Sequence, residues 1–213
     1  MERFTEFELE VTKELLNIAL ANSADAYSKM ANERILFKGY ELSILKSDEL
    51  STLLHGLEEE QLYVLTTEIK GKIEGICYLV FNKDDATQAF KTFAPGQDVI
   101  AENGELGEFQ QAILMELDNI LSAAMVTQLS NILELFVYGD VPNYKLLSQA
   151  QFLKLIEKDH ELYYKVAMNI KTRLESNKTN ISPYFIWLFK EDFVDAVKSI
   201  VEKKKEGVLL KKS

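Results

Sequence analysis

The sequence predicts an α+β fold in which a unit of helix, strand, helix, β-hairpin and helix occurs twice. First, stretches with apolar residues at helical spacing alternate with shorter stretches rich in β-branched and aromatic residues. Second, the order of these stretches is the same in both halves of the 213-residue chain, at an offset near 102. Third, the long helix of each half carries a Glu-x-x-Asn motif followed by Ile, at Glu14–Asn17 and Glu116–Asn119. We therefore expect pseudo-two-fold symmetry, with a mixed or antiparallel sheet and the two long motif helices packed on one face.

The first long helix is predicted over residues 5–32. Apolar side chains recur there at spacings of four and three residues, at Phe7, Val11, Leu15 and Ile18. Residues 34–45 contain β-favouring side chains and are predicted to be extended. A short helix follows, which Ser47 is placed to cap and Gly56 to end.

A β-hairpin is predicted over residues 61–81. Its two arms are rich in β-branched and aromatic residues, and Gly71 lies in the turn between them. Asn82 then caps a helix that ends near Phe93. The Pro- and Gly-containing segment 94–98 begins the connection to the second half.

The second half repeats this order. The predicted elements are a long helix (106–131), an extended segment (133–141) ended by Pro142, a helix (143–158), two hairpin strands (162–173 and 182–190) and a last helix (192–204). The whole chain, residues 1–213, is predicted to be a single domain, because no Gly- or Ser-rich stretch forms a linker. Its pseudo-repeats are approximately 1–95 and 103–205, and residues 206–213 are predicted to be a flexible tail.

The charge balance argues against nucleic acid as a partner. The chain has 34 acidic and 24 basic residues, a net charge of −10, whereas phosphate binding requires a basic surface. The N-terminus is charged and amphipathic, unlike a signal peptide, and no apolar run approaches the roughly 20 residues that span a bilayer. We expect a cytoplasmic protein without membrane insertion.

The chain has few candidates for metal or covalent chemistry. Cys77, the single cysteine, lies in an apolar run and is predicted to be a core residue. His55 and His160 have no Cys or carboxylate partners at metal-ligand spacing and are predicted at surface or polar-core positions. No P-loop, dinucleotide-binding glycine motif or G-x-S-x-G motif occurs. The sequence therefore predicts that the protein binds no cofactor of its own.

The repeated Glu-x-x-Asn motif is the candidate site. Residues three apart are neighbours on a helix, so Glu14 projects with Asn17 and Glu116 with Asn119. Residues 112–125 are so apolar that this helix is expected to be mostly buried, and buried Glu and Asn side chains would need partners. Either each pair is a solvated strip or a local hydrogen bond, or it is directed at a ligand or partner protein. The recurrence of the motif at equivalent positions favours the second interpretation.

These residues resemble the motif of the CheC/CheX/FliY-type chemotaxis phosphatase family in its two-motif, CheC-like form. That motif is Asp or Ser, three residues, Glu, two residues, Asn, 22 residues and Pro. Glu116, Asn119 and Pro142 fit it, since 22 residues separate Asn119 from Pro142. In the first copy Tyr40 stands at the proline position. The order of elements fits the family over nearly the whole chain.

The chain departs from the family pattern at two further positions of each motif. Glu10 and Ala112 stand where the family has Asp or Ser, and Leu16 and Asp118 stand where it usually has Gly. The last two are predicted to alter access to the asparagine or the docking of a partner. A solvated or capping role is expected for Asp118, which lies about 100° around the helix from Asn119.

The resemblance implies a phosphatase that hydrolyses the aspartyl phosphate of a CheY-like response regulator. Asn17 and Asn119 would orient the attacking water, and Glu14 and Glu116 would pair with the regulator's active-site lysine. Mg²⁺ would belong to the regulator. A CheD-like protein is a further expected partner. The alternatives are a non-catalytic protein of the same fold that binds a regulator, a CheD-like partner or a flagellar-switch component, and an unrelated α+β domain whose repeated pair is coincidental.

Overall fold

The computed structural model describes most of the chain. The described residues are 4–45, 61–96, 98–162, 164, 166–176 and 180–210. The short helix predicted between Ser47 and Gly56, together with His55, lies outside them.

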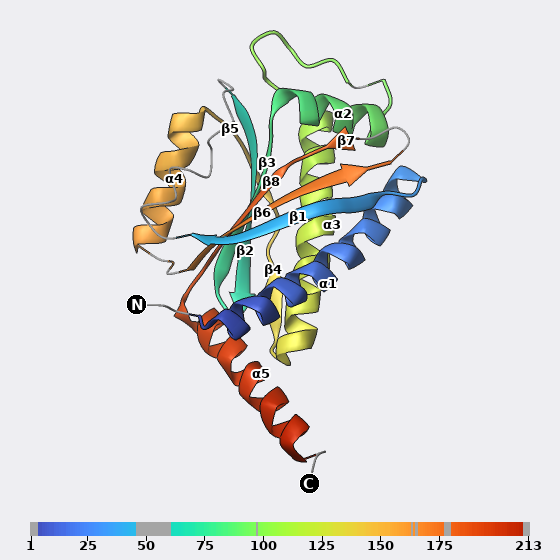
Figure 1. The fold of residues 1–213 in the computed structure, drawn as a ribbon. Helices are drawn as coiled ribbons and strands as arrows, with labels where there is room; N and C mark the ends of the chain where they lie inside the picture. Colours follow the sequence, from blue (N-terminus) through green and yellow to red (C-terminus); the bar gives the residue numbers. More distant parts are fainter. Residues whose placement is uncertain are drawn as a thin grey trace.

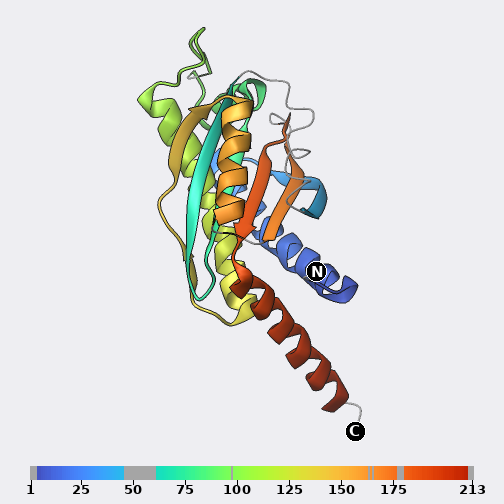
Figure 2. The same ribbon diagram turned by 90° about the vertical axis from the view of Figure 1, so that its left-hand side faces the viewer.

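A central β-sheet separates helices on its two faces (Figure 1). The motif helices α1 (Glu6–Ala31) and α3 (Glu108–Leu133) pack against each other on one face, together with the shorter α2 (Lys83–Phe93). Helix α4 (Gln149–Leu162) lies on the opposite face, in front of the strands in Figure 2. Helix α5 (Glu191–Leu210) leads away from the sheet to the C-terminus.

All pairs of strands in the sheet are antiparallel. Within the described residues the strands are β1 (Leu36–Leu45), β2 (Leu62–Gly71), β3 (Gly75–Phe81), β4 (Val137–Gly139), β5 (Asn143–Leu147), β6 (Val166–Glu175), β7 (Asn180–Ile181) and β8 (Tyr184–Phe189). Their order is β1-β6-β8-β3-β2-β4, with β5 also pairing with β2 and β7 with β6. The predicted α+β class with an antiparallel sheet and two motif helices on one face is confirmed.

The two halves of the chain exchange their first strands. Strand β1, from the first half, pairs with β6 of the second half, whereas β4 and β5 pair with β2 of the first half. The hairpin strands β3 and β8 pair at the centre. The sheet is therefore built in the same way from either edge, which is the pseudo-two-fold arrangement. The repeat limits near residues 95 and 103, and the tail limit at 206, remain predictions.

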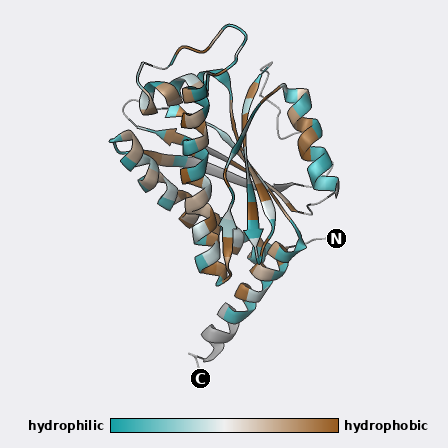
Figure 3. Ribbon diagram, turned by 180° about the vertical axis from the view of Figure 1, so that it is seen from behind, coloured by the Kyte–Doolittle hydropathy of each residue, from teal (hydrophilic) through white to brown (hydrophobic). Residues whose placement is uncertain are grey.

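Alternate side chains of the strands pack into two apolar cores. Leu65 and Leu79 face the core under α1 and α3, while Val64 and Val80 face the core under α4. This alternation is the period-two pattern of a sheet covered on both faces. Figure 3 shows hydrophobic residues along the strands of the sheet. Strand β3 is buried along its whole length, as its central position requires.

The helix predicted over residues 143–158 is wrong at its start. Residues Asn143–Leu147 form strand β5, and α4 begins only at Gln149. Ser148 caps the helix, because its hydroxyl accepts from the Gln151 amide (3.2 Å) and its own amide donates to the Gln151 side chain (2.8 Å). Pairing with β2, a contact distant in sequence, holds the preceding five residues extended.

Two other predicted limits also change. The extended segment predicted over residues 133–141 is shorter, because α3 continues to Leu133 and β4 spans only Val137–Gly139. Pro142 accordingly lies in the break between β4 and β5, three residues after the last residue of β4. The last helix extends past its predicted end at residue 204 to Leu210.

Tyr27→Phe is expected to destabilise the contact between the two motif helices. The buried Tyr27 hydroxyl donates a hydrogen bond to the Leu117 carbonyl at 2.9 Å, which joins α1 to α3. Losing one such bond lowers the free energy of unfolding by about 1 kcal/mol, measurable by urea denaturation. Tyr138→Phe, which removes the hydroxyl of a half-exposed tyrosine, is the control. Equal stabilities of the two variants would contradict this role.

Candidate functional site

The two motif helices cover equivalent positions in the two halves of the chain. Each has 26 residues, and each begins and ends 102 positions from the other. Their C-caps, Asn32 and Glu134, both adopt the left-handed conformation, with φ of 51° and 54°. Every buried position of α1 has a buried counterpart 102 residues later in α3. The two Glu-x-x-Asn motifs therefore occupy the same place in their halves of the fold.

The outward surfaces of the two helices are more alike than their buried sides. Identical residues stand at eight equivalent positions: Glu6/Glu108, Phe7/Phe109, Glu14/Glu116, Leu15/Leu117, Asn17/Asn119, Ile18/Ile120, Ala21/Ala123 and Ser28/Ser130. Of these pairs, only Leu15/Leu117 is buried. The buried positions differ in size and polarity, as in Leu20/Ser122. The similarity of the helices thus lies mainly on the surface that a partner can reach.

The motif side chains face outward. Glu14, Glu116 and Asn119 are exposed, and Asn17 is half-buried. Burial of the second pair, expected from the apolar surroundings of α3, is wrong, because α3 buries a broad face and leaves a narrow exposed strip that includes Glu116 and Asn119. Within the described part of the chain, none of the four side chains has a hydrogen-bond or ion-pair partner. This also argues against a local hydrogen bond between the motif residues.

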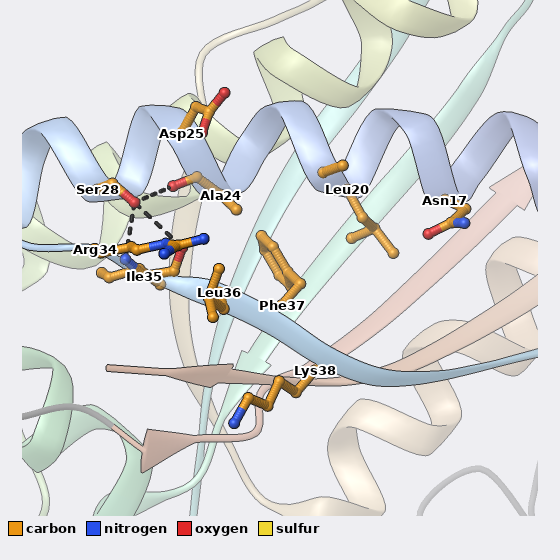
Figure 4. Close-up of a pocket in the computed structure, with 11 residues that line it drawn as sticks. Asn17, Leu20, Ala24, Asp25, Ser28, Arg34, Ile35, Leu36, Phe37 and Lys38 are labelled. Carbon is orange, nitrogen blue, oxygen red and sulfur yellow. Dashed lines mark hydrogen bonds between the residues drawn. The ribbon is translucent and has the colours of Figure 1, made fainter. Parts of the chain in front are cut away.

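A cavity of about 250 Å³ lies beside Asn17, between α1 and the start of β1 (Figure 4). Ser28 joins its two walls: its hydroxyl donates to the Ala24 carbonyl (2.7 Å) and accepts from the Ile35 amide (2.9 Å). The lining is mixed, with apolar Phe37 near its middle and the cationic Arg34 toward the end away from Asn17. The first motif therefore has an open cavity beside its asparagine.

Asp118, the residue before Asn119, is fully buried beneath α3. Its carboxylate accepts hydrogen bonds from the hydroxyls of Thr67 in β2 (2.6 Å) and Ser122 (3.0 Å). Burial raises the pKa of Asp118 to about 6, although the two hydrogen bonds act in the opposite direction. The predicted solvated or capping role is wrong, because the side chain ties α3 to the sheet.

The side chains at the family's glycine position face the interior of the protein. Leu16 is 1% exposed, and its counterpart Asp118 is likewise enclosed. Neither side chain therefore covers the neighbouring asparagine. Access to Asn17 and Asn119 is set by the outward faces of the helices instead.

The positions of Tyr40 and Pro142 correspond structurally. Tyr40 lies in β1 where the pairing with β6 shifts register, between Lys38 and Glu41. Pro142 lies in the break between β4 and β5, 102 residues later. Each outer strand therefore departs from regular pairing at the position of the family's proline, whichever residue stands there.

The sequence did not point to the residues that hold the motif helices in place. Thr67, Ser122 and Tyr27 are common residue types without a distinctive spacing, and their roles depend on contacts between distant segments. His160 is buried, which agrees with a polar-core position. Among the described residues, no group of three or more His, Cys, Asp or Glu side chains could hold a metal ion.

Helix α3 is long and apolar enough to span a membrane by length and composition alone. The core helix of a soluble protein meets the same criteria. In the structure α3 packs against α1, β2 and β4, and its apolar residues contribute to the core beneath the motif helices.

Comparisons with known proteins agree with this architecture. The chain is 25% identical to the CheY-P phosphatase CheC of Bacillus subtilis (strain 168) over 143 residues, 66% of this chain and 67% of that protein. FliY from Thermotoga maritima has a similar fold, with a TM-score of 0.69 at 18% identity, covering 94% of this chain and 98% of that one. A chain of the FliG–FliM complex from H. pylori gives a TM-score of 0.67 at 10% identity, covering 90% and 100%. No family model matches the chain.

The fold and site define a class of α+β protein with two equivalent motif helices on one face of an antiparallel sheet. The similarity to CheC and to FliY supports a CheC/CheX/FliY-type family for this chain. The similar proteins include one named as a phosphatase and a chain from a FliG–FliM complex, so the family alone does not decide between catalysis and binding.

Proposed function

We propose that this protein hydrolyses the aspartyl phosphate of a CheY-like response regulator in the cytoplasm. The main support is the repetition, on the outward faces of two equivalent helices, of a Glu and an Asn that have no partner among the described residues. An unpaired carboxylate and carboxamide three residues apart suit a partner that carries both a cation and a reacting phosphoryl group. The similarity to a CheY-P phosphatase favours the same function.

In this mechanism the residues act by positioning. Glu14 or Glu116 pairs with a lysine beside the regulator's phosphoaspartate and fixes the docked geometry. The carboxamide of Asn17 or Asn119 holds a water in line with the phosphorus, the water oxygen bonds to phosphorus, and the regulator's aspartate carboxylate leaves. Asparagine does not titrate, so it orients the water without removing its protons, which leave with the released inorganic phosphate. When bound by the regulator, Mg²⁺ would supply positive charge that offsets the charge of the phosphoryl group.

Phosphate loss from purified phospho-regulators tests this function. We expect the full chain to accelerate the decay of at least one CheY-type regulator from the same organism by about tenfold or more. The measurement follows radiolabelled or Phos-tag-resolved phospho-regulator over time, with and without the protein. Unchanged phosphate lifetimes for every regulator would refute the enzymatic function.

The second candidate function is binding without hydrolysis. It is favoured by the structural similarity to a chain of the FliG–FliM complex, and by Glu10 and Ala112 at positions where the phosphatase motif has Asp or Ser. The partner would be a regulator, a CheD-like protein or a flagellar-switch component. Phosphorylation-dependent capture of a regulator whose phosphate lifetime is unchanged would select this function.

A further inference from the structure

The segments that follow the two motif helices differ in charge, although the motifs themselves are identical. Arg34 lies between α1 and β1, and Phe136, 102 residues later, lies between α3 and β4. Lys38 of β1 corresponds in the same way to Asp140, which follows β4. Two cations of the first half are thus replaced by an aromatic ring and an anion in the second half. The two motifs therefore have differently charged surroundings.

Arg34 is a cation that the first half leaves available beside its motif. Lys38 also lines the cavity next to Asn17, but it pairs with Glu175 at 2.7 Å, and its ammonium group points away from α1 in Figure 4. The exposed Arg34 side chain has no hydrogen bond or ion pair with the described residues. Asp25, an acidic residue of the lining, directs its carboxylate away from β1 in Figure 4. The guanidinium therefore offers its N–H donors at one end of the cavity.

The cavity extends along α1 from the motif to Arg34. Its lining residues on α1 have the spacing of one helix face: Asn17, Leu20, Ala21, Ala24, Asp25 and Ser28. This row spans eleven residues, or about 16 Å along the helix axis. The cavity volume of about 250 Å³ is several times that of one water molecule, roughly 30 Å³. A side chain of a docked partner therefore has room in it.

The lining selects the chemistry of that side chain. Leu20 and Phe37 provide apolar walls, and Arg34 provides a cation at the end away from Asn17. Arginine binds a carboxylate through two parallel hydrogen bonds, and a pair that is partly enclosed is screened less than one in open solvent. The phosphoryl group of a docked regulator would lie at Asn17, at the other end of the row. Arg34 would therefore meet a different acidic group of the partner, an Asp or Glu side chain.

We propose that Arg34 determines specificity at the first site by pairing with a carboxylate on the surface of the partner docked at Glu14 and Asn17. The identity of that partner, the receiver domain of a response regulator, rests on the proposed function. The second site makes no such pair, because Phe136 stands at the equivalent position and its ring lies 5.4 Å from that of Tyr138, centroid to centroid. The two sites thus share one chemistry and differ in the regulator that each prefers.

The test measures each site alone, by binding of CheY-type regulators from the same organism loaded with beryllofluoride in place of the phosphoryl group. Glu116→Ala with Asn119→Ala leaves the first site of the full chain, and Glu14→Ala with Asn17→Ala leaves the second. Arg34→Glu should weaken binding at the first site by at least about tenfold and change the second by less than about twofold. The loss should shrink as the salt concentration rises, because it is electrostatic.

Lys29→Glu is the matched control. Lys29 is an exposed lysine of α1 outside the cavity lining, so this variant makes the same change of charge and should bind normally. Arg34→Gln removes the charge with a smaller disturbance and should weaken the first site by about threefold or more. In the decay assay, Arg34→Glu should raise the regulator concentration for half-maximal rate at the first site, while the maximal rate changes by less than about twofold.

The outcomes separate this inference from the enzymatic function. Loss of first-site affinity in Arg34→Glu but not in Lys29→Glu, with a regulator whose phosphate lifetime the unaltered chain leaves unchanged, supports the inference and refutes the enzymatic function. Accelerated phosphate loss with equal first-site affinities in these two variants overturns the inference and leaves the enzymatic function intact. Equal losses at both sites also overturn it, as does failure of every regulator to bind. Thermal unfolding checks that each variant is folded.

Discussion

Replacing both motif asparagines by alanine is expected to abolish the acceleration of phosphate loss. Asn17 and Asn119 are the side chains proposed to hold the attacking water, each at its own site. The double variant should therefore lower the maximal rate by about 100-fold or more, whereas either single variant retains a substantial part. Binding to a regulator loaded with beryllofluoride, a mimic of the phosphorylated state, should change little, because the Glu contacts remain. The measurement pairs the decay assay with the binding titration.

The chain offers a matched control for this experiment. Asn22 and Asn131 are exposed asparagines on α1 and α3, outside the Glu-x-x-Asn motifs. Replacing both by alanine changes the same residue type on the same helices and should leave the rate unaltered. Equal rates in the two double variants would show that the motif asparagines do not position the water. Unequal losses in the single variants would show which helix is the more active.

Asp118→Asn is expected to stabilise the protein at neutral pH. The pKa of Asp118 is raised by burial from 3.8 to about 6, so the folded state holds its proton more tightly than the unfolded state does. Below about pH 3 both states are protonated and the carboxyl group has no differential effect. As the pH rises through the interval between the two pKa values, the unfolded state ionises first. The free energy of unfolding then falls by up to about 3 kcal/mol. An amide does not ionise and avoids this loss.

The stability difference between the variant and the unaltered chain should therefore grow with pH and level off above about pH 7. Urea denaturation at several pH values measures it, and the single tryptophan, the buried Trp187, reports unfolding by its fluorescence. Asp25→Asn, at an exposed position on α1, is the control and should change stability little. A difference between Asp118→Asn and the unaltered chain that is constant with pH would contradict this explanation.

Local sequence patterns predict most of the elements of this fold. Helix α1 and the two arms of the β2–β3 hairpin follow from patterns between neighbours in the chain, and these elements agree with the structure. The apolar stripe predicted for α1 is correct at the buried Leu15, whereas Phe7 and Ile18 are exposed. Residues 143–147 show the limit of such patterns. Tyr144 and Leu146 fit a short helix or a strand equally well, and only pairing with β2, some 80 positions earlier, makes the segment extended.

The sequence was sufficient to choose the residues of the candidate site, but not to predict which of their side chains are exposed. Repetition at an offset of 102 singled out Glu14, Asn17, Glu116 and Asn119. Their exposure was not predictable, because in a helix as apolar as α3 the composition does not reveal which side faces the core. The same uncertainty hid the exposure of Phe7 and the burial of Asp118.

The sequence by itself determined the order of elements, the duplication and the identity of the motif pair, because these depend on local periodicity and on spacing along the chain. Tertiary structure alone decided the rotation of each motif helix about its axis, since packing on the sheet and between α1 and α3 sets that angle. The rotation places Asp118 against Thr67 and leaves the adjacent Asn119 facing solvent. Two neighbouring polar residues thus have opposite environments, one inside the protein and one available to a partner.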